Sequence, residues 1–206
     1  MAAAATSPML PALLLLIAFA AATTGAAETS ALDHTCAMLG EYYYVEPELC
    51  KSVLCADPSE PCHATRDQAA VAMLAARLAV RNATATKGLV EAALAAHAGN
   101  ATVAKGIESC VQLYAGVVAI LQRAAQFVAA GRYREAGQVL NANPPIVVPD
   151  RCDGAMGAGD AAALLPREND AFAYMALVAH SIINNMKSFY FAKYMDTFHR
   201  MMKTED

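Results

Sequence analysis

Apolar residues recur every three or four positions along most of this chain, which is the period of an α-helix that buries one face. The pattern is clearest between residues 102 and 130. The apolar positions there are Cys110, Leu113, Tyr114, Val117, Leu121, Ala124 and Val128. The polar Gln112, Arg123 and Gln126 fall elsewhere on the same helix. We therefore predict a long amphipathic helix that ends near Gly131, because glycine commonly stops helices.

The same period predicts three more helices. An alanine-rich helix covers residues 64–97, and a shorter one covers 132–140. The shorter helix cannot continue unbroken through Pro144 and the proline after it, and a looser region rich in Pro, Gly and Ala follows. The last helix runs from about 168 to 186 and then either continues or frays. No segment shows a strong two-residue alternation, so we expect no sheet.

These segments predict an all-α fold with an antiparallel four-helix bundle over residues 63–188. Residues 28–62 precede the bundle as a disulfide-linked helical hairpin. A proline at position 47 divides its two short helices, because proline disfavours helix before it and suits the first turn of a new one. Residues 189–206 follow the bundle as a C-terminal tail.

Residues 1–27 carry the pattern of a secretory signal peptide. Residues 10–22 form a nearly continuous apolar run, and the small Gly25 and Ala27 suit cleavage after residue 27. The run is shorter than the roughly 20 residues that span a bilayer. No lysine or arginine precedes it, so a signal anchor or a buried helix is the alternative. A cleaved signal predicts a secreted protein that has no membrane contact after cleavage.

Secretion also decides how the cysteines are interpreted. An even number of cysteines in an oxidising compartment implies disulfides, and this chain has six. They are Cys36, Cys50, Cys55, Cys62, Cys110 and Cys152. Spacing alone does not fix the pairing, although a Cys36–Cys50 bridge is the simplest way to tie the hairpin. Zinc binding by three of these cysteines and His63 is disfavoured, because the close Cys-x-x-Cys pairs of most structural zinc sites are missing, so we expect no metal.

Two glycosylation sequons agree with a secreted protein. They begin at Asn82 and Asn100, each followed by alanine and threonine. If both asparagines carry glycans, both must face solvent.

Composition and motifs narrow the function further. The chain has 15 basic and 19 acidic residues, so its net charge of −4 lacks the basic excess of a nucleic-acid-binding protein. A hydrophobic content of 57% is too high for a disordered chain. No nucleophile elbow, zinc-protease motif or phosphate-binding loop is present, and none of the five histidines belongs to a recognised pair. We expect no catalytic residue and no cofactor, and a helical domain that acts by binding.

Several segments, in this order and spacing, resemble the plant invertase/pectin methylesterase inhibitor family over about residues 32–186. They are Cys36, Pro47-Glu48-Leu49-Cys50, Leu78-Ala79-Val80-Arg81-Asn82-Ala83-Thr84, Cys110-Val111-Gln112-Leu113-Tyr114, Gly131-Arg132-Tyr133-Arg134-Glu135-Ala136, Cys152-Asp153-Gly154 and Leu165-Pro166-Arg167-Glu168-Asn169-Asp170-Ala171-Phe172. The resemblance implies a cysteine-linked hairpin, a four-helix bundle and two family disulfides, Cys36–Cys50 and Cys110–Cys152. Cys55 and Cys62 then pair with each other, as an addition to the family pattern.

The resemblance also implies a function without chemistry of its own. Members inhibit either pectin methylesterases or acid invertases, and the bundle is thought to cover the target's active-site cleft in a 1:1 complex. We therefore expect a protein secreted to the apoplast, although vacuolar sorting remains an alternative, and a partner that is one of these two enzymes.

The sequence departs from the motifs of both kinds of inhibitor in this family, and the two departures bear on which enzyme is the target. Invertase inhibitors of this family commonly carry Pro-Lys-Phe, whereas the corresponding stretch here is Gly131-Arg132-Tyr133, and arginine does not replace lysine equivalently. Esterase inhibitors usually have Ser-Ala-Ala before the fourth family cysteine, which this chain replaces with residues 141–145. We favour pectin methylesterase, with invertase as the alternative. A secreted helical carrier of an apolar ligand is the alternative from another class.

Positions off the apolar stripes supply the expected contacts with the partner enzyme. Three of them, Gln112, Arg123 and Gln126, face away from the core on the predicted helix that carries Cys110. The other three, Arg132, Tyr133 and Arg134, lie at the start of the next helix. Ordinary solvated side chains are the competing interpretation for each of them.

Overall fold

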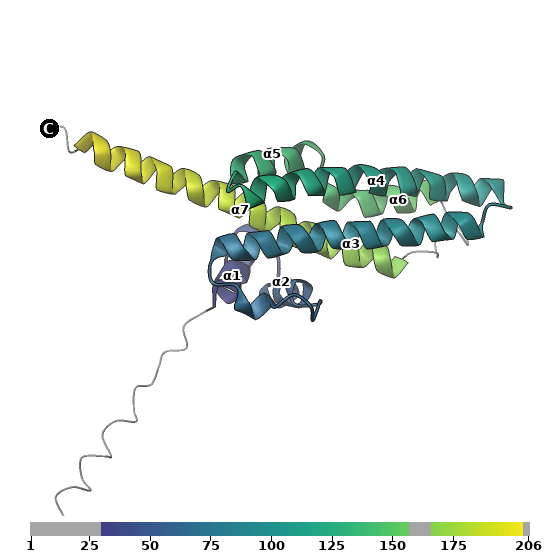
Figure 1. The fold of residues 1–206 in the computed structure, drawn as a ribbon, viewed down its shortest axis with the longest axis horizontal. Helices are drawn as coiled ribbons and strands as arrows, with labels where there is room; N and C mark the ends of the chain where they lie inside the picture. Colours follow the sequence, from purple (N-terminus) through teal and green to yellow (C-terminus); the bar gives the residue numbers. More distant parts are fainter. Residues whose placement is uncertain (1–29, 157–165, 204–206) are drawn as a thin grey trace, which may run out of the picture.

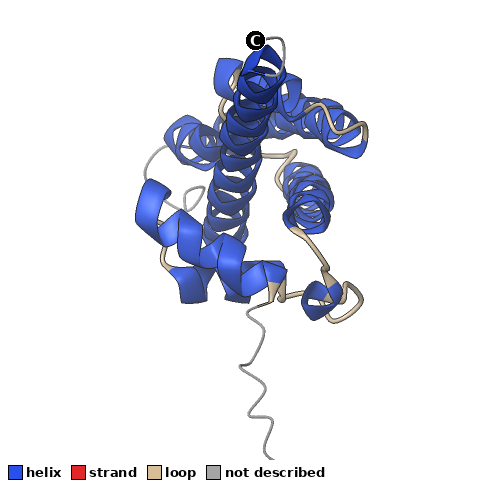
Figure 2. Ribbon diagram, turned by 90° about the vertical axis from the view of Figure 1, so that its left-hand side faces the viewer, coloured by secondary structure: helices blue, strands red, loops and turns tan. Residues whose placement is uncertain are grey.

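The computed structural model describes residues 30–156 and 166–203, and every regular element in those ranges is helical (Figure 2). The α-helices are α1 (Ala31–Tyr43), α2 (Pro47–Leu54), α3 (Gln68–Ala96), α4 (Ala101–Ala129), α5 (Tyr133–Ala142), α6 (Val148–Met156) and α7 (Pro166–Lys203). Two short 3-10 turns, η1 (Cys62–Ala64) and η2 (Pro145–Val147), connect them. The predicted all-α fold is confirmed. The signal peptide expected at residues 1–27 lies outside the described residues.

Helices α3 and α4 lie side by side and antiparallel along the long axis of the molecule (Figure 1). Helix α7 packs against α3 and α5, while α5 and α6 both pack against α4. The hairpin of α1 and α2 covers the bundle where α3 begins (Figure 1). This is the predicted helical bundle preceded by a hairpin.

Helix α6 is the main departure from the predicted elements. The sequence predicted a loose region after Pro144, yet η2 and α6 occupy residues 145–156. Pro149 stands in the first turn of α6, where its missing N–H is not needed and its fixed φ suits a helix. The bond from Cys152 to Cys110 then holds α6 against α4.

Side-chain caps fix where the two longest bundle helices begin. Asp67 accepts a hydrogen bond from the backbone N–H of Ala70 at the start of α3, with an N···O distance of 2.7 Å. Asn100 does the same at the start of α4, accepting from Val103 at 3.3 Å. Each cap satisfies an N–H group that has no partner inside its helix, so the turn between α3 and α4 is defined by its own sequence.

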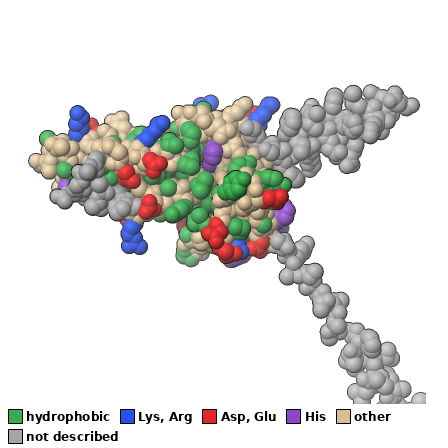
Figure 3. All heavy atoms as spheres, turned by 180° about the vertical axis from the view of Figure 1, so that it is seen from behind, with side chains coloured by type: hydrophobic (Ala, Val, Ile, Leu, Met, Phe, Trp, Pro, Cys, Tyr) green, Lys and Arg blue, Asp and Glu red, His purple; other side chains and the backbone are tan. Residues whose placement is uncertain are grey.

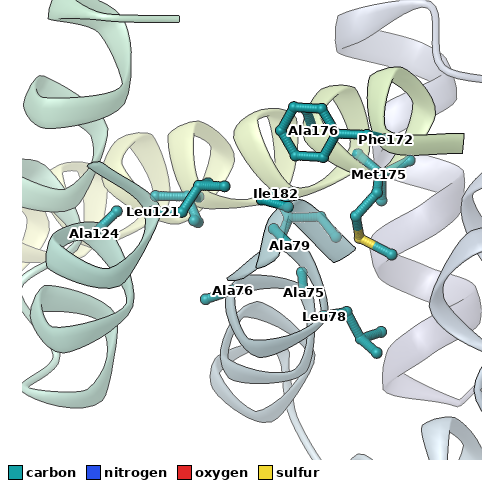
Figure 4. Close-up of a cluster of buried hydrophobic side chains, with 14 of the residues drawn as sticks. Ala75, Ala76, Leu78, Ala79, Leu121, Ala124, Phe172, Met175, Ala176 and Ile182 are labelled. Atoms are coloured by element: carbon teal, nitrogen blue, oxygen red, sulfur yellow. The ribbon is translucent and has the colours of Figure 1, made fainter. Parts of the chain in front are cut away.

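Small residues form the part of the core where α3 meets its neighbours. The buried alanines of α3 include Ala72, Ala75, Ala76, Ala79 and Ala83. Figure 4 shows the alanines of α3 facing Leu121 of α4 and Ile182 of α7. Alanine lets the backbones of packed helices approach closely, and the larger side chains of α4 and α7 fill the space that remains.

A second core layer joins α4, α6 and α7 through polar groups. The buried Tyr114 ring meets Phe172 edge-on, with ring centroids 5.4 Å apart. The Tyr114 hydroxyl donates to Oδ1 of Asn169, 2.7 Å away, and Nδ2 of Asn169 donates to Oδ1 of Asp153. One turn before Tyr114, Cys110 is bonded to Cys152. This layer sets the position of α7 relative to α4 and α6.

Helix α7 continues as a single helix from Pro166 to Lys203, beyond the bundle (Figure 1). Its buried stripe includes Met175, Ile182, Ile183 and Met186, as the period of the sequence indicates. Helix α7 therefore continues through residue 188, where we had placed the boundary between the bundle and a C-terminal tail.

Substitution of Gly106 on α4 tests the close packing against α6. A Cβ at Gly106 would lie 2.9 Å from the carbonyl oxygen of Ala155 and 3.1 Å from Cα of Met156, both backbone atoms. We expect Gly106→Ala to lower the free energy of unfolding by about 1–3 kcal/mol through overpacking. Chemical denaturation followed by circular dichroism measures this change.

Gly116→Ala on the same helix is the matched control, because no atom would lie within 4 Å of its Cβ. It should raise stability by about 0.5–1 kcal/mol, since alanine favours helix over glycine. Equal stability of the two variants would contradict the close contact between α4 and α6.

Candidate functional site

A groove runs along α4 beside the connection from α5 to α6. Its volume is about 580 Å³. Ser109, Gln112 and Ile120 line it from α4, and Pro144 and Arg151 line it from the other side. The chain turns away from α4 at the two prolines that end α5, and Gly116 has no side chain to fill the space. The groove is therefore apolar inside and has polar groups from both walls.

A second hollow, of about 420 Å³, continues this groove toward the end of α4. The two share Ile120, Ala142 and Asn143, and the second also contacts Arg123 and Gln138. The α4 residues that line them span positions 109 to 123, which is about 21 Å of helix. Together they form the α4 groove, a long shallow feature open to solvent.

The α4 groove ends beside a cluster of cations and an aromatic ring. The guanidinium carbon of Arg132 lies 4.7 Å from the centroid of the half-buried Phe127 ring, and that of Arg123 lies 5.8 Å from it. Arg132 also pairs with Glu135, with Nε 3.1 Å from Oε1. A backbone hydrogen bond and the Arg132 contact lower the pKa of Glu135. Both arginines are thus held in place while remaining exposed.

Another groove, of about 800 Å³, separates α3 from α4 on the opposite flank of α4. Its polar lining includes Gln126, Arg77, Arg81 and Glu60. Glu60 pairs with Arg77 at 2.8 Å and with Arg81 at 3.2 Å. These ion pairs attach the loop between Cys55 and Cys62 to α3, so they serve the structure of the hairpin junction.

Helix α4 carries half-buried apolar side chains beside an exposed face of small and polar residues. Its most apolar window has a mean hydropathy of 1.3, yet only 28% of that window is buried. Membrane spans share this length and composition, but α4 packs against α3, α5 and α6 as a bundle helix. Half-buried Leu113 and Ile120 thus lie beside exposed polar groups such as Gln112, a mixture that protein-binding surfaces share.

The structure exposes five of the six residues expected to contact a partner. These are Gln112, Arg123, Gln126, Arg132 and Arg134. Gln112 and Arg123 line the α4 groove, whereas Gln126 faces the groove beside α3. Tyr133 corrects the expectation, because it is only 6% exposed and packs in the core. The first turn of α5 directs this ring toward the bundle. The hydrophobic pattern of so short a helix did not indicate which of its sides faces the core.

Three residues of this surface were missed in the sequence. Arg151 lies in α6, which the sequence did not predict, and Pro144 was interpreted only as a helix breaker. Phe127 stands four residues after Arg123, a spacing that brings side chains together on a helix and could have identified the pair.

The disulfides of the structure join the pairs that the family resemblance implies: Cys36–Cys50, Cys55–Cys62 and Cys110–Cys152. The side-chain donors of Cys55, Cys62 and His63 also lie within 4.8 Å of one another. Because both sulfurs are bonded to each other, this group offers a metal only the imidazole.

The two sequons occupy different environments. Asn100 is exposed at the start of α4, and its cap uses Oδ1, which leaves Nδ2 for a glycan. Asn82 lies inside α3, and its Oδ1 is buried without a hydrogen-bond partner. The half-buried Asn82 therefore faces solvent less than Asn100 does, and glycosylation at both sequons stays a prediction.

The family model for plant invertase/pectin methylesterase inhibitors matches residues 30–156, from the hairpin through α6. The chain belongs to this family. Neither a curated protein nor a solved structure matches it. Members of the family are inhibitors rather than enzymes, they are generally secreted to the apoplast, and they bind pectin methylesterase or invertase. The inhibitor described here therefore acts on one of these two classes of enzyme.

A half-buried histidine makes the stability of the inhibitor depend on pH. Nε2 of His180 on α7 lies 2.8 Å from Oδ1 of Asn141, and burial lowers the pKa of His180 from its ordinary value of 6.5. The unfolded chain thus binds this proton more readily than the folded one. His180 contributes full stability above the unfolded pKa, and the contribution is lost as pH falls toward the folded pKa. We expect His180→Gln to reduce the fall in Tm between about pH 7.5 and pH 5.

Differential scanning calorimetry at both pH values measures this change, with the exposed His34→Gln as the control. An equal fall in Tm for the wild type and His180→Gln would remove His180 from the pH dependence.

We expect glycan occupancy to differ between the sequons. Expression in a plant or insect cell should give a glycan at Asn100 and little or none at Asn82, because the amide of Asn82 is partly enclosed by α3 and its neighbours. Gel mobility of Asn100→Gln and Asn82→Gln, with and without glycosidase, reports each site. A mobility shift lost only in Asn82→Gln would reverse the assignment.

Proposed function

We propose that this inhibitor is secreted and blocks a pectin methylesterase by laying the outer face of α4 across the enzyme's active-site cleft. The observation that supports it is the α4 groove, which half-buried apolar side chains such as Ile120 line, with the exposed Gln112 and Arg123 along it. Such a face can exclude water over a large area while its few polar groups orient the contact. No bond is made or broken, because the inhibitor only occupies the cleft.

The structure around residue 132 favours the esterase over invertase as the target. Invertase inhibitors of this family present a lysine and an aromatic side chain from a Pro-Lys-Phe motif. At the corresponding positions here Arg132 is engaged with Phe127 and Glu135, and Tyr133 is buried. Tyr133 therefore cannot enter a sucrose cleft without rearrangement of α5, and the exposed Arg132 would have to give up its contacts with Phe127 and Glu135.

Rigidity makes steric blocking effective. The disulfide to α6 and the Tyr114 hydrogen bond hold both walls of the α4 groove before the partner arrives. A surface that is already ordered loses little conformational entropy on binding, so more of the contact energy appears as affinity. Because each chain carries one copy of the α4 groove, binding through it predicts a 1:1 complex.

Two substitutions on α4 test this function in an inhibition assay with a plant pectin methylesterase. Gly116→Trp fills the α4 groove, and Arg123→Ala removes a cation at its end. We expect each to raise the inhibition constant by about tenfold or more, as central interface residues do, with Tm almost unchanged. Glu91→Gln on the exposed side of α3 is the matched control and should inhibit like the wild type.

The same titration against an acid invertase separates the alternatives. Loss of invertase activity alone would assign the inhibitor to invertase, through the exposed Arg132. Full activity of both enzymes across several isoforms would reject the inhibitor function of this chain and bring forward the carrier of an apolar ligand.

A further inference from the structure

The turn between α1 and α2 places a tyrosine where folding does not require one. Tyr44 has φ of 56° and ends α1 in the left-handed conformation. Its side chain is 95% exposed, so the ring buries almost no surface within the inhibitor. At the end of α4 the same backbone conformation is taken by Gly131, with φ of 69°. Glycine adopts this conformation without the Cβ clash that tyrosine suffers, so Tyr44 is retained at a cost to stability.

A second exposed tyrosine and two carboxylates lie near Tyr44 in the sequence. Tyr42 is 62% exposed, and Glu41 and Glu46 are exposed on either side of the tyrosines. We call these four residues the hairpin patch. Figure 3 shows hydrophobic side chains next to acidic ones on the part of the surface that the hairpin forms. Neither carboxylate forms an ion pair with any residue that the structure describes. The nearby Lys51 is already paired with Asp33 and Glu48.

The backbone that carries the hairpin patch is fixed. Val45, next to Tyr44, is 2% exposed, and its N–H donates to the carbonyl of Leu39 at 3.3 Å. Pro47 begins α2, and the Cys36–Cys50 bond joins the two helices. The tyrosines are therefore presented on an ordered turn, which reduces the entropy lost when a partner binds.

We propose that the hairpin patch docks a protein surface bearing arginine or lysine and that, given the proposed function, this surface belongs to the inhibited enzyme. The electron-rich faces of tyrosine rings attract guanidinium and ammonium groups, and unpaired carboxylates beside them attract the same groups. Both kinds of side chain thus select a cation. The hairpin patch then adds a contact outside the α4 groove and favours target isoforms with a basic surface over acidic ones.

Variants that keep the fold test this proposal against a basic and an acidic pectin methylesterase isoform. Tyr44→Asn suits the left-handed backbone better than tyrosine does, so Tm should stay equal or rise. The double variant Tyr42→Ala/Tyr44→Asn should raise the inhibition constant for the basic isoform about tenfold and leave that for the acidic isoform unchanged. Tyr174→Ala removes a tyrosine that is 49% exposed on α7, and as the matched control it should change neither constant. Equal constants for the double variant and the wild type, or an equal loss for both isoforms, would overturn the proposal.

A second measurement tests whether the hairpin patch binds cationic side chains, independently of the inhibitor function. The full chain is titrated into a fluorescently labelled heptaarginine peptide, and binding is followed by the fluorescence anisotropy of the peptide. We expect the peptide to bind the double variant at least threefold more weakly than the wild type, whereas Tyr174→Ala binds normally. If neither enzyme is inhibited by the wild type, the proposed function fails, and this titration still tests the patch. Equal binding of the peptide by all three proteins would overturn it.

Discussion

The hydroxyl of one buried tyrosine joins three helices that are distant in the sequence. Tyr114 of α4 donates to Asn169 of α7, which in turn donates to Asp153 of α6. Burial raises the pKa of Tyr114, so the hydroxyl remains a donor at any physiological pH. Loss of this donor would leave a buried amide oxygen unsatisfied, at a cost of about 1–3 kcal/mol. The bond between Cys110 and Cys152 closes a loop over a separation of 42 residues and contributes about 4 kcal/mol in the chain-entropy account.

The α4 groove depends on these hydrogen bonds and on the Cys110–Cys152 disulfide, because α6 forms the far wall of the groove. Without the disulfide and the hydrogen bonds, the segment after the two prolines has few reasons of its own to remain helical. Gly106 permits the end of α6 to approach α4, and Gly116 leaves the space between the walls open. The same helix thus uses one glycine for close packing and another for a surface that a partner can enter.

The two proposed contact surfaces differ in charge and in their relation to stability. The α4 groove has a largely apolar lining with arginines near its end, and the exposed side chains of α4 are compatible with a stable helix. The hairpin patch is acidic and aromatic, and Tyr44 sits in a backbone conformation that favours glycine. Tyr44 thus contributes little to folding in this conformation, which is why we assign it to binding. Different regions of a target enzyme would meet these two surfaces.

Local sequence determined the helices, since the three-to-four-residue period of α3, α4 and α7 is a property of each segment alone. Hydrophobic burial then requires a bundle, and the family motifs implied the same disulfide pairs. Helix α6 and the burial of Tyr133 depend on contacts with distant segments, so no local sequence pattern predicted them. The groove likewise exists only where α4, η2 and α6 meet. Periodicity specifies which residues face inward, but the position of a turn relative to another helix is decided by tertiary packing.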